Sequence, residues 1–286
     1  MTFLRQLLAV LLCCTVLSSH AQDWRYVKGE KLYEDLDDAI AHKDEVYNLQ
    51  LFRRQVDRTK LYRIGEMKNL QYLSITEAGL DSLPDTIFSL PNIRTLDLVN
   101  NAFTSIPAGI RRLKSLEYLV MYDNRISSIP DWIGELTKLE TLILPRNRIE
   151  RISAHIGALR YLKDLSLGEN ALRYCPPEIG RLPSLEILEL EGNQLRELPA
   201  TISGLSHLQI LYLNENQLRE LPATIGELGG LIVLTLDANQ LSDIPVEVGR
   251  LKRLKTLTLN VGDNRNVDHD DPGMDRGIKA PRMAGP

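Results

Sequence analysis

The stretch LEILELEGNQLRELPATISGLSH, residues 185–207, is followed without a gap by LQILYLNENQLRELPATIGELGG, residues 208–230. Both segments share the 23-residue spacing L-x-x-L-x-L-x-x-N-x-L-x-x-L-P-x-x-I-x-x-L-x-x. The same period extends over eight units from Leu70 to Arg253, and a ninth, incomplete unit begins at Leu254. So strict a period indicates a stack of small units that bury their apolar faces against one another, and it argues against a single closed core.

The first half of each unit predicts a strand followed by a polar bend. The segment L-x-x-L-x-L alternates apolar and polar residues, as a half-buried strand does, so we expect the stacked units to form a parallel sheet. The asparagine that follows is expected to turn inward and to bond backbone groups of its own and neighbouring turns. This asparagine recurs at Asn101, Asn124, Asn147, Asn170, Asn193, Asn216 and Asn239.

The second half of each unit predicts a turn on the opposite side of the coil. The L-P pair closes that turn, because proline fixes φ and removes a backbone donor. The following I-G-x-L stretch predicts a short helical or 3₁₀ turn with Ile and Leu pointing inward. The fold class predicted is therefore an α/β solenoid, a horseshoe with a parallel concave sheet and short helical or 3₁₀ turns on its convex side.

The L-P-x-x-I-G-x-L units resemble a subclass of leucine-rich repeats found in Ras-group scaffold proteins and in many secreted bacterial proteins. The resemblance covers residues 46–260, and it is specific for the fold but not for the ligand. It implies protein–protein recognition on the concave face. A cytoplasmic signalling scaffold like the Ras-group proteins stays open if the N-terminus is not an export signal.

Residues 1–21 have the three-part layout of a secretory signal peptide. Arg5 precedes an apolar stretch at residues 7–17, which is followed by small and polar residues. The stretch is too short for a typical transmembrane helix, and nothing else in the chain is expected to span a bilayer. Lipidation at Cys13 or Cys14 is an alternative, although the residue before Cys13 is not small.

Cysteine usage after signal removal favours an exported bacterial protein. A chain that begins at residue 22 holds Cys175 as its single cysteine, so it forms no intramolecular disulfide. It also has no N-x-S/T glycosylation sequon. Animal repeat proteins of this kind usually carry disulfide-stapled caps, so we expect a bacterial protein that is secreted or held in the cell envelope.

The N-terminal end of the stack is expected to be covered by a helix. In residues 22–45, the side chains of Leu32, Leu36, Ala39 and Ile40 fall on one helical face, and acidic residues surround them. Such an amphipathic helix would cover the apolar edge of the first coil. We therefore predict an N-terminal capping helix here.

The solenoid is expected over residues 46–260, with its first strand at residues 46–51. Residues 261–286 are rich in Gly, Pro, Asp, Asn and Arg and are expected to form a disordered tail. The leucines of residues 254–259 would then lie on an open edge of the stack. The tail, a partner or further sequence of a longer chain could cover that edge, and it could also support self-association.

A search for chemistry predicts no enzyme, no cofactor and no metal site. The chain has no phosphate-binding glycine loop, no Cys/His cluster and no G-x-S-x-G turn. His155 falls on a convex turn with no nucleophile at a fixed spacing, and the acidic residues near the C-terminus do not match a calcium loop. The net charge of −4 argues against a nucleic-acid partner.

The concave face is the predicted binding surface. Side chains between the strand leucines are expected to point to solvent and to align in columns across the repeats. These columns hold an apolar, aromatic patch in repeats three and four and a second one in repeats six to eight with an acidic border. The candidate partner-binding residues are Tyr118, Val120, Tyr122, Ile143, Glu189, Glu191, Tyr212 and Asp237.

These residue types indicate a protein or peptide partner, and the acidic border indicates a basic one. The preference of strands for aromatic and β-branched residues is the plain alternative explanation of the patches. Two functions stay open at this point. The first is a non-catalytic secreted or surface recognition module, and the second is an envelope adhesin or a self-associating structural spacer.

Overall fold

A computed structural model describes residues 27, 29–53 and 56–259 of the 286-residue chain. The predicted signal peptide, residues 1–21, and the predicted tail, residues 261–286, lie outside the described residues. Within the described part of the chain, no helix has the length and apolar character needed to cross a membrane.

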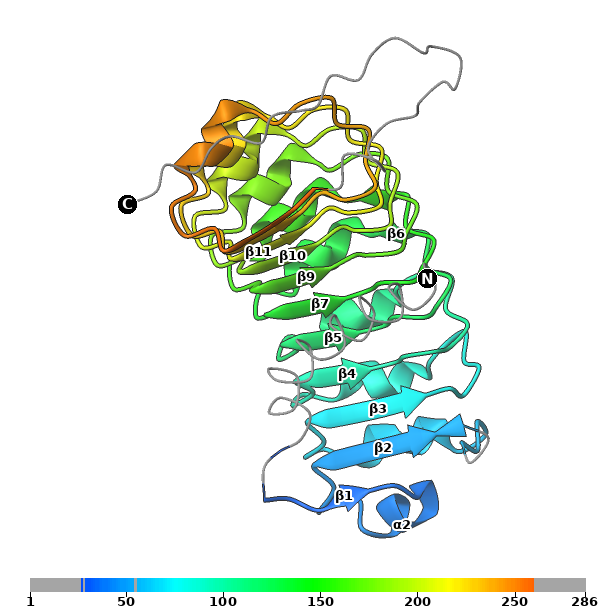
Figure 1. Ribbon diagram of the computed structural model, residues 1–286. Coiled ribbons are helices and arrows are strands. Elements are labelled where there is room, and N and C mark those ends of the chain that lie inside the picture. Colours follow the sequence, from blue (N-terminus) through cyan, green and yellow to red (C-terminus); the bar gives the residue numbers. More distant parts are fainter. Residues whose placement is uncertain (1–26, 28, 54–55, 260–286) are drawn as a thin grey trace, which may run out of the picture.

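One long parallel sheet runs the length of the molecule (Figure 1). Its eleven strands pair in sequence order, apart from two short strands that lie outside it. Equivalent leucines are in register, as Leu119 with Leu142 and Leu142 with Leu165. The strands are β1 (Leu32–Tyr33), β2 (Asn48–Phe52), β3 (Tyr72–Thr76), β4 (Thr95–Asp97), β5 (Tyr118–Val120), β7 (Thr141–Ile143), β9 (Asp164–Ser166), β10 (Ile187–Glu189), β11 (Ile210–Tyr212), β12 (Val233–Thr235) and β13 (Thr256–Thr258).

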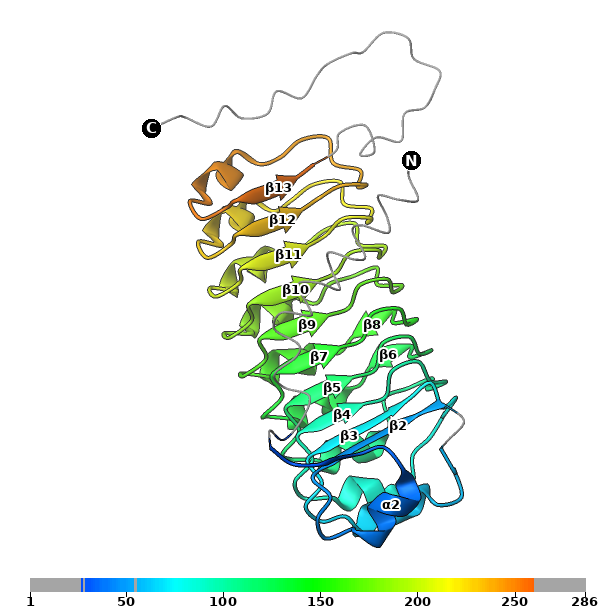
Figure 2. The ribbon, with the colours of Figure 1, turned by 60° about the horizontal axis from the view of Figure 1, so that its bottom comes forward.

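Short 3₁₀ turns cover the other side of the coil (Figure 2). All but the first begin after a proline or, at η6, after Ser153, whose Oγ accepts a hydrogen bond from the His155 amide at 3.1 Å. The turns are η2 (Leu61–Glu66), η3 (Asp85–Ser89), η4 (Ala108–Arg112), η5 (Asp131–Glu135), η6 (Ala154–Ala158), η7 (Pro177–Arg181), η8 (Ala200–Gly204), η9 (Ala223–Glu227) and η10 (Val246–Arg250). Strands β6 (Ser128–Ile129) and β8 (Arg151–Ile152) form a two-stranded sheet at the side.

The core lies between the sheet and the 3₁₀ turns. The repeat leucines and isoleucines fill it, and most of them have no exposed surface. Cys175 belongs to this core, where burial raises the pKa of its thiol to about 12. The structure confirms the predicted solenoid, in which each coil buries its apolar side chains against the coils before and after it.

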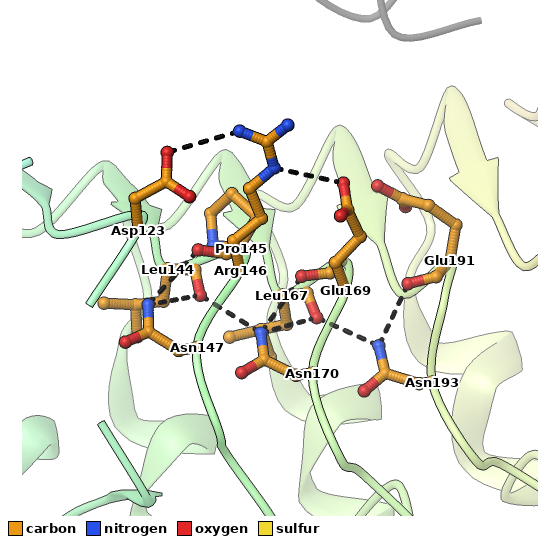
Figure 3. A network of polar contacts seen from close by, with 11 residues as sticks. Asp123, Leu144, Pro145, Arg146, Asn147, Leu167, Glu169, Asn170, Glu191 and Asn193 are labelled. Atoms are coloured by element: carbon orange, nitrogen blue, oxygen red, sulfur yellow. Dashed lines mark hydrogen bonds and ion pairs between the residues drawn. The ribbon is translucent and has the colours of Figure 1, made fainter. Parts of the chain in front are cut away.

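A ladder of asparagine side chains holds successive coils together (Figure 3). Asn193 is representative: its Nδ2 donates to the carbonyl oxygens of Leu167 and Leu190, both at 3.0 Å, and to that of Glu191 at 3.1 Å. Its Oδ1 accepts a hydrogen bond from the Leu172 amide at 3.0 Å. The predicted inward-turned asparagine is confirmed, because one side chain satisfies backbone groups of two adjacent coils.

The N-terminal end differs from the predicted single helix. Leu32 lies in β1, which pairs with β2, so the sheet begins one strand earlier than expected and Leu32 is not on a helical face. The helix α2 is only the six residues Leu36–Ala41, and Asp35 caps it by accepting a hydrogen bond from the Asp38 amide at 2.8 Å. Strand pairing wins here because β2 would otherwise leave its backbone groups unpaired.

The last described strand, β13, has no further strand beside it among the described residues. Leu257 in this strand is 40% exposed, whereas the equivalent leucine of the preceding strand, Leu234, has no exposed surface. The expected open edge is thus present at this end of the described stack.

Candidate functional site

The outward side of the eleven-stranded sheet, opposite the 3₁₀ turns, is called the concave face below. Three columns of outward side chains cross β3 to β13, at the third, fifth and seventh positions of each 23-residue unit. Their described members include no lysine or arginine. The acids in these columns are Asp97, Asp164, Glu189, Glu191 and Asp237. The charged residue types of these three columns are therefore all acidic, whereas Arg94, Lys163 and Arg146 stand in the neighbouring columns, where they form ion pairs.

The first predicted patch is partly closed off from solvent. Tyr122 is 36% exposed and Tyr118 is half-buried, but Val120 and Ile143 are only 4% and 7% exposed. The expectation that all four point freely to solvent was wrong for the two aliphatic residues. Parallel strands lie about 4.8 Å apart, so larger side chains on neighbouring strands cover the smaller ones between them.

The second predicted patch, Ile187, Ile210, Tyr212 and Val233, contributes Tyr212 to the candidate residues, and its acidic border contributes Glu189, Glu191 and Asp237. Tyr212, Glu191 and Asp237 are half-buried, whereas Glu189 is only 5% exposed. The Ser166 hydroxyl, on the neighbouring strand β9, donates a hydrogen bond to Glu189 Oε2. Glu189 therefore joins neighbouring strands through this hydrogen bond. The expectation that its side chain is exposed to a partner was wrong.

Two carboxyl groups near Glu189 are unusually enclosed. Asp164 Oδ1 and Glu191 Oε2 have no solvent contact and no hydrogen-bond partner among the described residues. Burial, and secondarily the charge of Glu189, raises the pKa of each carboxyl to about 8. The nearby Glu169 and Glu215 add to the shift at Glu191. Both carboxyls are therefore mostly protonated at neutral pH.

The sequence prediction did not select Asp164 and Glu169, and it gave Glu215 only as part of the acidic border of the second patch. Asp164 was not selected because it lies between the two apolar patches. Its position in an outward strand column could have identified it from the sequence. Glu169 and Glu215 belong to another column, the residue directly before each ladder asparagine, which adopts a left-handed backbone conformation with φ of 51° and 57° at these two positions. That conformation is visible only in the structure.

The raised pKa values predict that stability falls as pH rises from about 5 to 8. In that window, the folded state keeps protons on Asp164 and Glu191 that the unfolded chain releases. Each retained proton contributes a slope of up to about 1.4 kcal/mol per pH unit. Urea unfolding at several pH values should show this loss, and the double variant Asp164→Asn with Glu191→Gln should reduce it. A slope that the double variant leaves unchanged would contradict the assignment.

A convex cluster around His155 was not foreseen. A cavity of about 530 Å³ between η5 and η6 is lined by Asp131, Trp132 and His155, among others. The Ser153 hydroxyl donates to Asp131 Oδ1 at 2.6 Å and lies 3.2 Å from His155 Nδ1. Ser153 and Asp131 thus both lie beside Nδ1 of His155. In a catalytic triad, the serine and the aspartate contact opposite nitrogens of the imidazole ring. The cluster caps η6 and does not form a catalytic triad.

The comparisons with known proteins agree with this architecture. The family described as leucine-rich repeat region matches residues 45–152 and 150–272. The chain therefore belongs to the leucine-rich repeat proteins. Among curated protein sequences, none matches it.

Three solved structures illustrate the range of similar proteins. A leucine-rich repeat protein of Leptospira interrogans is 29% identical, with a TM-score of 0.57, 82% of this chain covered and 74% of that one. An internalin of Listeria monocytogenes is 24% identical, with a TM-score of 0.65, 79% of this chain covered and 64% of that one, and shows the fold alone. A plant peptide hormone receptor, solved in complex with RGF2, is 27% identical, with a TM-score of 0.56, 74% of this chain covered and 38% of that one. The fold and its neighbours indicate a protein-binding module.

Proposed function

We propose that this protein is a non-catalytic recognition module, secreted or held at the cell surface, that binds an extended basic segment of a protein or peptide along its concave face. The observation that carries the proposal is the composition of that face: its described outward columns hold five acidic residues and no lysine or arginine, and a basic partner would favour the ionised form of those acids. A basic partner would associate faster with this acidic surface, and the positions of the acids would fix its alignment along the face.

Tyrosine side chains supply the expected anchors. Tyr122 is exposed, and Tyr118 and Tyr212 are half-buried, so each offers an apolar ring and a polar tip to a partner. Glu189 is the register neighbour of Tyr212 on the adjacent strand, which places an acidic residue next to this apolar ring. This combination suits an extended chain that alternates apolar and basic side chains.

The export of the protein is supported by the signal-like N-terminal sequence described above. The peptide complex of the structurally similar plant receptor offers a precedent for peptide binding on this fold. Neither identifies the partner, which depends on the side chains of this particular face.

The test is affinity capture from cell-surface extracts with the full chain as bait. A matched bait carries Tyr122→Ala and Tyr212→Ala on the concave face. A control bait carries Tyr62→Ala and Tyr161→Ala, which remove two tyrosines that are 55% and 62% exposed and lie outside the sheet strands. Glu189 is left unchanged, because it is buried and its loss would disturb the sheet.

We expect a partner that the wild-type and control baits retain and that the concave-face variant loses at least 10-fold. Equal capture by all three baits would overturn the proposal. Capture of the protein by itself alone would favour the self-associating spacer, because the exposed Leu257 and the open edge of β13 offer a surface for it.

A further inference from the structure

An alternating charge ladder runs along one border of the concave face (Figure 3). It consists of Asp123, Arg146 and Glu169, which directly precede three of the ladder asparagines; Asn100 and Ala238 in the same column are uncharged. Arg146 Nη1 lies 3.2 Å from Asp123 Oδ2, and Arg146 Nε lies 3.4 Å from Glu169 Oε1. One guanidinium group thus bridges two carboxylates that belong to the coils on either side of it.

The alternation breaks at Gly192. The column continues from Glu169 to Gly192 and then to Glu215, so the position where the next cation would stand has no side chain. The backbone there is the same as at Arg146, with φ of 63° at Gly192 and 53° at Arg146. Among the described residues, no cation forms an ion pair with Glu191 or Glu215. At Gly192, therefore, no positive side chain separates the carboxylates of Glu169 and Glu215.

Glu191 forms the inner wall of this gap. Its carboxyl lies directly over Gly168, where an added Cβ would come within 2.1 Å of Oε1. Its Oε2 is shielded from solvent and has no hydrogen-bond partner among the described residues. The carboxyl extends toward Glu169 in Figure 3, and it feels the charges of Glu189, Glu169 and Glu215. A shielded carboxyl oxygen normally accepts a hydrogen bond, so Glu191 lacks a donor that a bound group could supply.

Asp164 shows the same incompleteness at the far end of the acids. Asp164 is half-buried, and its Oδ1 has no solvent contact and no hydrogen-bond partner among the described residues. The charge it feels is that of Glu189, which also acts on Glu191. We define the acidic strip as Glu169, Glu191 and Glu215, the three acids that border the gap at Gly192.

We propose that the acidic strip seats an arginine side chain of the bound segment, with its guanidinium group above Gly192 between Glu169 and Glu215. The inference rests on the proposed function and deepens it by naming the chemistry of one contact. Arg146 provides the template within the same column. A planar guanidinium suits the site because it donates to several carboxylates at once and is weakly hydrated. A metal ion is a poorer fit, since no group of His, Cys, Asp and Glu in the described residues is arranged to hold one.

The first test uses a small probe and the full chain. Nα-acetyl-arginine amide is titrated against the ¹⁵N-labelled protein, with Nα-acetyl-citrulline amide as the uncharged probe of the same shape. We expect saturable shifts at the Gly168 and Gly192 amides with the arginine probe, and at least 10-fold weaker binding of the citrulline probe. Glu191→Gln and Glu215→Gln should each weaken the arginine probe several-fold. Equal binding of both probes, saturation of the same amides by calcium chloride, or shifts elsewhere on the protein would overturn the proposal.

A second test fills the gap from within. Gly192→Arg should complete the charge ladder, raise the unfolding midpoint and abolish probe binding. Gly192→Gln is the matched control, because it places a side chain of similar size on the same left-handed backbone without the charge. Both added side chains meet Glu169 Cγ at a similar distance, 3.2 Å from the new Cβ. If the two variants have the same midpoint, no cation is favoured above Gly192.

These tests separate the two proposals. A partner captured through Tyr122 and Tyr212, combined with no binding of the arginine probe, would remove the arginine seat and leave the recognition function in place. Probe binding without any captured partner would support the seat and overturn the wider proposal.

Discussion

Replacing Asn193 with alanine is expected to lower the free energy of unfolding by about 3–5 kcal/mol, because several buried backbone groups lose their partner at once. The change strands the buried carbonyls of Leu167 and Leu190 and the amide of Leu172, which belong to two adjacent coils. Each buried, unsatisfied group costs about 1–3 kcal/mol, and the alanine offers nothing in return. Chemical denaturation followed by circular dichroism measures the effect.

Asn92→Ala is the matched control for this experiment. Asn92 is exposed, and its side chain makes one hydrogen bond, to the Lys68 carbonyl at 2.9 Å. We expect a loss of at most about 1 kcal/mol there, since water can replace that bond. Similar losses for the two variants would show that the asparagine ladder contributes little to the stacking of the coils.

Gly180→Ala is expected to destabilise the protein by about 3 kcal/mol or more, at the upper end of what overpacking usually costs. A methyl group at Gly180 would lie 2.0 Å from the Thr201 carbonyl oxygen of the next coil. The obstacle is backbone, so it cannot rotate away, and the turns η7 and η8 would have to separate. Hydrogen exchange in these turns should rise together with the loss of stability.

Gly249→Ala tests the same repeat position at the end of the described stack. There, no described atom lies within 4 Å of the added Cβ. We expect no loss and a gain of up to about 1 kcal/mol from the lower entropy of the unfolded chain. A loss at Gly249 equal to that at Gly180 would mean that the close approach of successive coils is not the cause.

The sequence could predict the binding face because the outward column positions follow from the period of the strand. It could not predict how much of each side chain stays accessible. Tyr122 and Val120 are neighbours in this pattern, yet one is 36% exposed and the other 4%. The difference depends on which side chains stand on the adjacent strands, and therefore on the packing of three coils at once.

The two ends of the described solenoid also show which features the sequence could predict and which it could not. The period identified the last strand and its exposed Leu257, because a solenoid without a following coil leaves its end open. It misplaced Leu32, since the helical pattern of residues 32–40 is local, whereas the pairing of β1 with β2 is decided by a strand sixteen residues away.

By itself, the sequence determined the repeat, the solenoid, the inward asparagines and the absence of cations from the outward columns, because each of these follows from residue type at a fixed period. Only the tertiary structure decided that Asp164 and Glu191 are enclosed, that Gly192 interrupts a ladder of alternating charge, and that Gly168 lies beneath a carboxyl of the next coil. The reason is physical. Burial, pKa and ion pairing depend on distances between side chains 23 or more residues apart in the sequence, and the stacking of the coils sets those distances.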